Sequence, residues 1–293
     1  METSCDETAA ALVSDDGRVL SNVISSQAEL HARYGGVVPE VASRRHLELV
    51  TPVVRETLEQ AGASLDDVER VAVTRGPGLI GALLVGVQAA KAIAWSRKLP
   101  LIPVDHLQGH VASLYLRSEG LSGSEPQSLP LEPPFLCLLA SGGHTMLLDV
   151  QAHARWNVLG STLDDAAGEA FDKGARLLGL GYPGGAAIDR LAREGDPTAF
   201  SFPVARLDGF DFSFSGVPTA LLYAVRDLGA AAESRRADLA ASYQRAIVRA
   251  LVERTREAAE RTGAARIAVV GGVAANSELR ASLPEATLAP LAL

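Results

Sequence analysis

The chain has 293 residues, of which 47% are hydrophobic and 21% charged, and its formal net charge is −8. This composition is typical of a soluble globular protein with about two domains. No stretch approaches the roughly 18 consecutive apolar residues of a membrane span, and the acidic start lacks the apolar core of a secretory signal. Cys5 and Cys137 lie far apart in the sequence, which favours a reducing cytoplasm over a disulfide framework. The acidic balance argues against a stand-alone nucleic-acid binder, but not against one that shares its nucleic acid with a basic partner.

The first half of the chain alternates strand and helix patterns. Apolar residues at helical spacing predict a helix from Glu40 to Gly62, kinked or broken at Pro52. Small-residue and apolar periodicity predicts two further helices, over 82–95 and 111–116. The strands are predicted at 8–13, 19–25, 71–74 and 101–104. Strand–helix–strand–helix order implies a parallel sheet.

Two histidines, His106 and His110, follow the apolar run 101–104. Residues four apart lie on one face of a helix, with Cβ atoms roughly 6 Å apart, so both imidazoles can reach one ion of zinc, iron, copper or nickel. The alternative is a pair of half-buried helix histidines. A metal site needs a third ligand, and Asp105 would point about 100° away around a helix. Leu107 stands where an H-E-x-x-H metallopeptidase carries its general base, which disfavours that class.

A polar stretch rich in Ser, Gly and Pro, 117–134, is the best linker candidate, and the pattern restarts after it. Strands are predicted at 135–140, 145–150 and 156–159. The glycine turn at 141–144 echoes the polar turn at 3–8, as in a duplicated fold. If Gly142 and Gly143 have positive φ, their amides form an anion-binding nest; a plain glycine hairpin is the alternative.

The remaining pattern predicts a helix over 164–178, a glycine-rich helix start at 181–185, and a long helix capped by Asp238 and ended by Gly263. A carboxylate on the helix predicted over 164–178 can bind a ribose hydroxyl, or it can belong to a solvated ion pair at the surface. The strand at 266–270 ends in two glycines before the next helix, where nucleotides commonly bind at the carboxyl edge of a parallel sheet.

Taken together, nine segments in one order resemble the tRNA adenosine threonylcarbamoyltransferase family, formerly described as O-sialoglycoprotein endopeptidases. They include Glu-Thr-Ser-Cys-Asp-Glu-Thr, Gly-Pro-Gly-Leu, His-x-x-x-His and Ser-Gly-Gly-His-Thr, and the resemblance covers essentially the whole chain. The segments are 2–8, 34–43, 76–79, 106–110, 141–145, 164–173, 182–185, 211–216 and 271–276.

The resemblance implies a two-lobed actin/sugar-kinase/heat-shock ATPase-like α/β fold of duplicated ribonuclease-H-like domains with mixed sheets. The expected lobes are 1–130, with the histidine motif, and 131–293, with the adenylate-binding loops. His106 and His110 match the family's ligands for one divalent metal ion, Fe²⁺ first and Zn²⁺ second. The positions matching its substrate contacts are Leu139, Ala140, Ser141, Gly142, Gly143, Asp172, Gly185, Asp189 and Asn276.

The family transfers threonylcarbamoyl from threonylcarbamoyl-adenylate to N6 of the adenosine next to the anticodon in tRNAs that read ANN codons. An acyl-phosphate anhydride already has a good leaving group, so no nucleophilic Ser or Cys is needed. The resemblance also implies a cytoplasmic protein with two partner subunits in bacteria, an inactive paralogue and a P-loop ATPase.

The sequence departs from the family in three places. Met1 stands where the family has several strand residues, Pro218 replaces a usual Lys, and Leu293 precedes the Cys-Thr-Asp-Asn segment that carries the third metal ligand. We therefore expect weak metal binding and little transfer by the chain as written. The open alternatives are an inactive truncated fragment and a related metal-dependent carbamoyltransferase acting on a small molecule.

Overall fold

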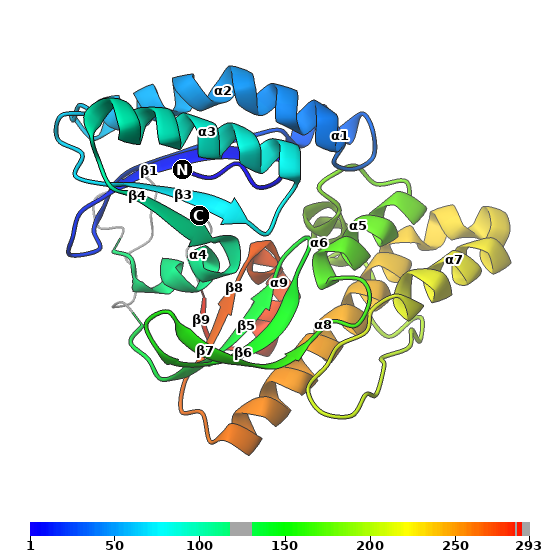
Figure 1. Ribbon diagram of the computed structural model, residues 1–293. Coiled ribbons are helices and arrows are strands. Elements are labelled where there is room, and N and C mark those ends of the chain that lie inside the picture. The colour runs from blue at the N-terminus through cyan, green and yellow to red at the C-terminus, as the bar shows by residue number, and fades with distance from the viewer. Residues whose placement is uncertain (118–130, 285, 289–293) are drawn as a thin grey trace. The chain divides into compact units, whose positions relative to one another are not determined.

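The computed structural model describes residues 1–117, 131–284 and 286–288, and most of the predicted linker lies outside these residues. The chain divides into two compact units, residues 1–131 and 132–291, and each is described here by itself (Figure 1). In the described part of the chain, no helix is long and apolar enough to cross a membrane.

Unit 1 pairs its strands two by two. The antiparallel hairpin β1 (Glu7–Val13) and β2 (Val19–Ser26) lies in one sheet, and the parallel pair β3 (Val71–Gly76) and β4 (Leu101–Asp105) lies in another. Figure 1 shows the two long helices of this unit lying together along its strands. The helical elements are α1 (Ala28–Ala32), α2 (Pro39–Gln60), α3 (Ile80–Arg97), α4 (His106–Ala112) and η1 (Ser113–Tyr115).

Met1 and Glu2 link the two pairs of strands. The Met1 amino group donates to Ala72 O at 2.9 Å and Thr74 N donates to Met1 O at 3.1 Å, which is parallel pairing with β3. Glu2 exchanges two backbone hydrogen bonds with Ala9 of β1, at 2.8 and 2.9 Å, which is antiparallel pairing. These two residues therefore occupy the place of a central strand between β1 and β3.

Unit 2 has the same order of strand directions in one continuous sheet. The spatial order is β7-β6-β5-β8-β9, in which β5 pairs antiparallel with β6 and parallel with β8. The strands are β5 (Phe135–Ala140), β6 (Thr145–Ala152), β7 (Arg155–Ser161), β8 (Ile267–Val270) and β9 (Ala286–Leu288). Because Met1 and Glu2 take the place of β5 in unit 1, the predicted duplication is confirmed.

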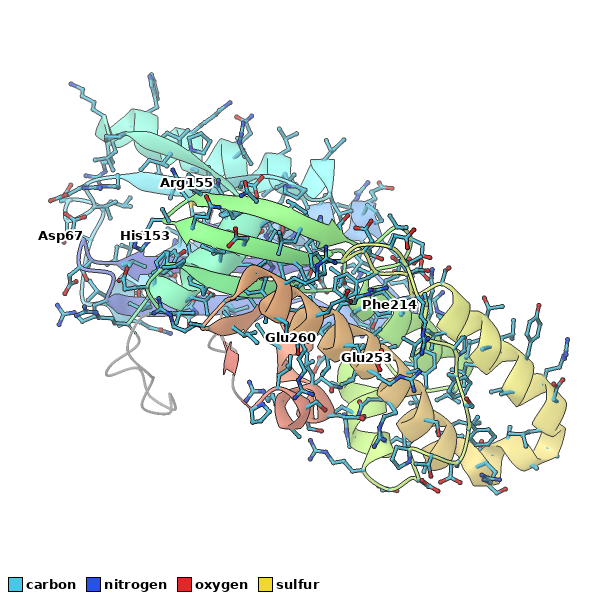
Figure 2. All side chains as sticks on the ribbon, turned by 90° about the horizontal axis from the view of Figure 1, so that it is seen from below. Asp67, His153, Arg155, Phe214, Glu253 and Glu260 are labelled. Atoms are coloured by element: carbon cyan, nitrogen blue, oxygen red, sulfur yellow. The ribbon has the colours of Figure 1, made fainter. Side chains whose placement is uncertain are left out.

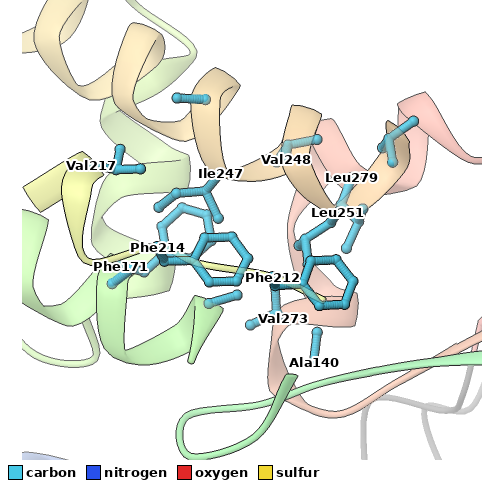
Figure 3. Close-up of a cluster of buried hydrophobic side chains, with 14 of the residues drawn as sticks. Ala140, Phe171, Phe212, Phe214, Val217, Ile247, Val248, Leu251, Val273 and Leu279 are labelled. Atoms are coloured by element: carbon cyan, nitrogen blue, oxygen red, sulfur yellow. The ribbon is translucent and has the colours of Figure 1, made fainter. Parts of the chain in front are cut away.

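The helices of unit 2 enclose a core rich in aromatic side chains. The Phe212 and Phe214 rings stack at a centroid distance of 6.0 Å among Phe171, Ile247 and Leu251 (Figure 3). Burial of such side chains stabilises the unit by about 1.5–3 kcal/mol each. The helical elements are α5 (Ala167–Leu177), α6 (Gly184–Ala192), α7 (Gly216–Leu228), η2 (Gly229–Arg235), α8 (Arg236–Thr262), η3 (Gly272–Ala275) and α9 (Ser277–Ser282).

The long helix α8 is amphipathic, as its apolar stripe predicts. Leu239, Tyr243 and Ile247 are fully buried, whereas Glu253 and Glu260 lie on the exposed face (Figure 2). Gly263 ends the helix in the left-handed conformation with φ 68°, as predicted. The predicted N-cap is wrong, because α8 begins two residues before Asp238, and that side chain accepts from Asp196 N instead.

Helix α2 runs through Pro52 without the break that was one of the two outcomes predicted there. Two other element boundaries differ from the sequence prediction. Helix α4 begins at His106, earlier than the predicted start at 111. Helix α5 begins at Ala167 instead of Asp164, because the Asp164 carboxylate accepts hydrogen bonds from the loop 50 residues later, including Phe214 N at 2.8 Å.

Candidate functional site

A tight turn, residues 141–144, joins β5 to β6 in unit 2. Ser141 N donates to His144 O at 2.8 Å, and His144 N donates to Ser141 Oγ at 3.1 Å, so the turn is closed on itself. Among the described residues, the amides of Gly142 and Gly143 have no acceptor. A Cβ added at either glycine would meet nothing within 4 Å. The two amides are therefore unbonded within the described residues, and the turn leaves room beside both glycines.

The predicted basis for this anion site is wrong in one respect. Neither Gly142 nor Gly143 has positive φ, so the turn is not a left-handed nest. Leu139 and Ala140, also expected in the loop, are the last residues of β5 and are fully buried. The loop that a ligand can reach therefore begins at Ser141.

Two glycines bring other elements against this turn. Gly271, at the end of β8, has φ 91°, and a Cβ there would lie 2.5 Å from Ala140 O. Gly168, in the first turn of α5, would place a Cβ 2.5 Å from Ser141 O. Only glycine permits these two approaches, so the β5–β6 turn, the β8–η3 connection and the start of α5 converge at one edge of the sheet.

Asp172 joins α5 to the start of α6. Its Oδ1 accepts from Gly184 N at 2.8 Å, and a Cβ at Gly184 would lie 2.6 Å from the Asp172 Cα. Gly185, the predicted contact residue, is not sterically required to be glycine, because a Cβ there would be 3.9 Å from its nearest neighbour, Phe171 Cβ. Asp172 is partly exposed, so part of its carboxylate remains reachable by solvent.

Asp189 and Asn276 are both buried and bonded to protein partners. Asp189 Oδ1 accepts from Ser277 Oγ at 2.6 Å, and Asn276 Nδ2 donates to Gln244 Oε1 at 2.7 Å. Asn276 Oδ1 also accepts from Leu279 N, as the N-cap of α9. These bonds tie α6 and α8 to the start of α9. The sequence did not indicate Gln244 or Ser277 as partners of these residues. An Asn before a helix start is a common N-cap signal, and it could have indicated the capping role of Asn276.

The two histidines lie on α4 in unit 1, His106 as its first residue and His110 in its last turn. Their ring centroids are 4.6 Å apart, with planes inclined at 71°. Asp105 is the N-cap of α4 and accepts from Leu107 N at 2.9 Å and Gln108 N at 3.3 Å. Its carboxylate is therefore held at the start of the helix by these two amides.

A carboxylate contacts the first histidine. Glu2 Oε2 lies 3.2 Å from His106 Nδ1, and the Ser4 hydroxyl lies 3.4 Å from the same nitrogen. Burial alone would raise the pKa of Glu2, but hydrogen bonds with His106, Ser4 and Thr74 lower that pKa to about 2. Glu2 is therefore ionised at neutral pH. The sequence motif included Glu2 but did not indicate this contact.

The donor set near α4 is incomplete for a metal ion. Two imidazoles suit zinc or iron, and catalytic sites usually have three protein ligands. Within residues 1–117, 131–284 and 286–288, no three His, Cys, Asp or Glu side chains come close enough together to hold a metal. The described residues thus supply two ligands and no third.

The chain is similar in sequence to one family along almost its whole length. The family model for tRNA N6-adenosine threonylcarbamoyltransferase matches residues 18–292. The protein of that name from Symbiobacterium thermophilum is 55% identical over 281 residues, covering 96% of this chain and 80% of the relative. The one from Geobacter sulfurreducens is 53% identical over 291 residues, covering 99% of this chain and 82% of the relative.

Two solved structures share the fold at low sequence identity. Component A of (R)-2-hydroxyglutaryl-CoA dehydratase from Acidaminococcus fermentans has a TM-score of 0.56 at 14% identity and covers 100% of this chain and 90% of its own. Full-length HypF in its phosphate- and nucleotide-bound form has a TM-score of 0.54 at 14% identity, and the match covers 82% of this chain and 46% of HypF. These likenesses confirm the predicted actin/sugar-kinase/heat-shock ATPase-like fold class. With relatives above 50% identity and a family match from 18 to 292, the chain belongs to the tRNA N6-adenosine threonylcarbamoyltransferase family.

Proposed function

We propose that this protein transfers threonylcarbamoyl from threonylcarbamoyl-adenylate to N6 of the adenosine next to the anticodon, in tRNAs that read ANN codons. Family membership supports the reaction class. The observation that carries the site assignment is the pair of unbonded amides at Gly142 and Gly143, at the carboxyl edge of the unit 2 sheet. This edge is where nucleotides and phosphates bind in folds with parallel strands.

The proposed reaction is an acyl transfer at the carbonyl next to the phosphate. The adenine amine attacks this carbonyl carbon, a C–N bond forms, the C–O bond to phosphate breaks, and AMP leaves while the amine loses a proton. The amides of Gly142 and Gly143 donate to the phosphate and stabilise the negative charge that grows on it. Because an exocyclic adenine amine is a weak nucleophile, positioning contributes a large share of the rate.

We assign the nucleoside of the adenylate to the side of the turn formed by α5, α6 and α9. Asp172, with its partly exposed carboxylate, is the side chain best placed to accept from a ribose hydroxyl. Asp189 and Asn276 are bonded to Ser277 and Gln244, so in this proposal they shape the adenine pocket and fix its walls. Gly185 contributes backbone at the start of α6.

We also propose that His106 and His110 are ligands of one divalent metal ion, Fe²⁺ in preference to Zn²⁺. Two imidazoles four residues apart on one helix support this assignment. When bound, such an ion supplies Lewis acidity toward a carbonyl or phosphate oxygen. The residues of α4 hold the two imidazoles on one side of the helix.

The proposed partners are tRNA, an inactive paralogous subunit and a P-loop ATPase, in the cytoplasm. A net charge of −8 is unfavourable for binding an RNA alone, which supports a shared tRNA site. Unit 1 also has apolar side chains on its surface where α2 and α3 meet, among them Leu47, Ile80 and Leu84. A Cβ at Gly81 would lie 2.5 Å from Ser43 Oγ, so the starts of these helices are in contact and can present one surface to a protein partner.

A reconstituted transfer assay tests the proposal. Synthetic threonylcarbamoyl-adenylate is incubated with the chain, both partner subunits and unmodified tRNA, and the modified nucleoside is quantified. A parallel reaction replaces tRNA with small amines and alcohols. Modification of the tRNA alone supports the proposal, whereas transfer only to a small molecule, or no transfer, contradicts it.

A further inference from the structure

Glu2 and His106 are in contact although 104 residues separate them in the sequence. The Glu2 carboxylate oxygen Oε2 lies 3.2 Å from His106 Nδ1, and both side chains are largely shielded, with exposed fractions of 30% and 24%. The contact is therefore made in a setting where a hydrogen bond to a charged group is strong.

The position of this carboxylate is fixed by other contacts. Thr74 Oγ1 donates to Glu2 Oε2 at 2.6 Å, and Ser4 N donates to Oε1. The backbone of Glu2 is paired with Ala9 of β1, and that of Met1 with β3. The Glu2 side chain therefore cannot leave His106 without breaking its hydrogen bonds with Thr74 and Ser4.

The topology explains why these side chains meet. Met1–Glu2, β3 and β4 run parallel, so they end at the same edge of the unit 1 strands. Glu2 lies at the end of the first, Thr74 is near the end of β3, and His106 follows β4 directly.

A carboxylate at this nitrogen decides the tautomer of the ring. An ionised carboxylate only accepts, so His106 Nδ1 must carry the proton, and the lone pair of the neutral imidazole lies on Nε2. In the part of the chain that the structure describes, Nε2 of His106 makes no hydrogen bond. Histidines that bind metals usually donate from the far nitrogen to a carboxylate, a backbone carbonyl or a water.

We infer that Glu2 is a positioning residue that holds His106 as the Nδ1–H tautomer and presents the Nε2 lone pair to an electrophile. The use of Nε2 in catalysis rests on the proposed function, but the tautomer itself does not. Ser4 is the competing candidate, because its hydroxyl lies 3.4 Å from the same nitrogen and can either donate or accept.

The test is a long-range proton–nitrogen NMR spectrum of histidine labelled with nitrogen-15, recorded where the imidazole is neutral. The chain has six histidines, and loss of one ring system in His106→Gln assigns the signals. We expect the wild-type ring to carry its proton on Nδ1, as it also should in Ser4→Ala. Glu2→Leu should move the proton to Nε2, the tautomer usual in water.

A second variant covers the case in which Glu2→Leu does not fold. Glu2→Gln keeps the size of the side chain, and its amide oxygen can accept from Ser4 N while its amide nitrogen donates to Thr74 Oγ1. We therefore expect a folded protein with a mixture of both tautomers. An Nε2–H ring in the wild type, an unchanged Nδ1–H ring in both Glu2 variants, or a change in Ser4→Ala equal to that in Glu2→Leu would overturn the inference. None of these outcomes depends on transfer activity.

Discussion

Gly168 lies directly against Ser141. Its amide donates to the Ser141 carbonyl at 3.1 Å, and a Cβ added at Gly168 would lie 2.5 Å from that same oxygen. The start of α5 is thereby held on the turn whose free amides form the candidate phosphate site. Any residue larger than glycine at position 168 must push the helix away from the turn.

We predict that Gly168→Ala destabilises unit 2 by about 1–3 kcal/mol, the usual cost of overpacking. Denaturant unfolding followed by circular dichroism measures the difference. Gly185→Ala is the matched control, because Gly185 is also the second residue of its helix but has its nearest neighbour at 3.9 Å. The control should be neutral or slightly stabilised, since alanine favours the helix. Equal losses of stability in the two variants would contradict the packing argument.

A second prediction concerns the carboxylate that secures the 211–216 loop. Burial raises the pKa of Asp164, but hydrogen bonds from Ser213, Phe214 and Ser215 lower it below the usual value. The ionised form thus stabilises the fold above pH about 4, and this contribution is lost as the pH falls through the lowered pKa. Because Asp164 is exposed and solvent screens its interactions, Asp164→Asn should lower the free energy of unfolding by only about 0.5–1 kcal/mol at neutral pH, and the difference from wild type should narrow in acid. If the difference in the free energy of unfolding between wild type and Asp164→Asn did not change with pH, the stabilisation would not come from the ionised carboxylate.

His46 gives a pH dependence in a higher range. This ring is fully buried on α2, with Nδ1 2.8 Å from Thr8 Oγ1 and Nε2 2.9 Å from Cys5 O. Burial lowers its pKa below the usual value. The unfolded chain therefore binds a proton first as the pH falls below about 6.5, and the free energy of unfolding decreases from there toward the lowered pKa.

The measurement for this prediction is urea unfolding between pH about 5 and 8. His46→Gln should flatten the slope of stability against pH, whereas His153→Gln, at an exposed ring, should leave it unchanged. An identical slope in wild type and His46→Gln would refute the assignment.

Elements whose structure depends only on their own residues could be predicted from the sequence. The apolar run at 135–140 predicted β5 to the residue, and Gly263 marked the end of α8. Both depend on properties of the segment itself, namely continuous hydrophobicity and the need for a left-handed residue. The order of the motifs predicted the family and the fold class for the same reason, since each motif is local.

What the sequence did not predict depends on partners far along the chain. The start of α5 is shifted because Asp164 bonds the loop around Phe214, and Asn276 is engaged by Gln244, 32 residues away. The close approaches of Gly168 and Gly271 to the turn also join segments that lie far apart in the sequence. A single sequence contains no measure of these distances.

The acidic charge gives a prediction about RNA binding. We expect the isolated chain to bind tRNA weakly or not at all in a filter-binding or fluorescence assay, and to gain affinity when both partner subunits are added. Tight binding by the chain alone, with a log–log salt slope of several phosphate contacts, would contradict a shared site.

The central claim is that the glycine turn after β5 holds the phosphate of the acyl-adenylate. Gly142 has no positive φ and no neighbour within 4 Å of a Cβ, so Gly142→Val should fold normally and place its side chain in the space that the phosphate needs. The control is Ala231→Val, at an exposed position in η2.

The most direct measurement is isothermal titration of a non-hydrolysable threonylcarbamoyl-adenylate analogue into wild type and both variants. Hydrogen bonds to a charged group contribute about 1.5–3 kcal/mol each, so we predict that Gly142→Val weakens binding by about 10–100-fold, while Ala231→Val binds like wild type. Unchanged affinity in a correctly folded Gly142→Val protein would contradict the account.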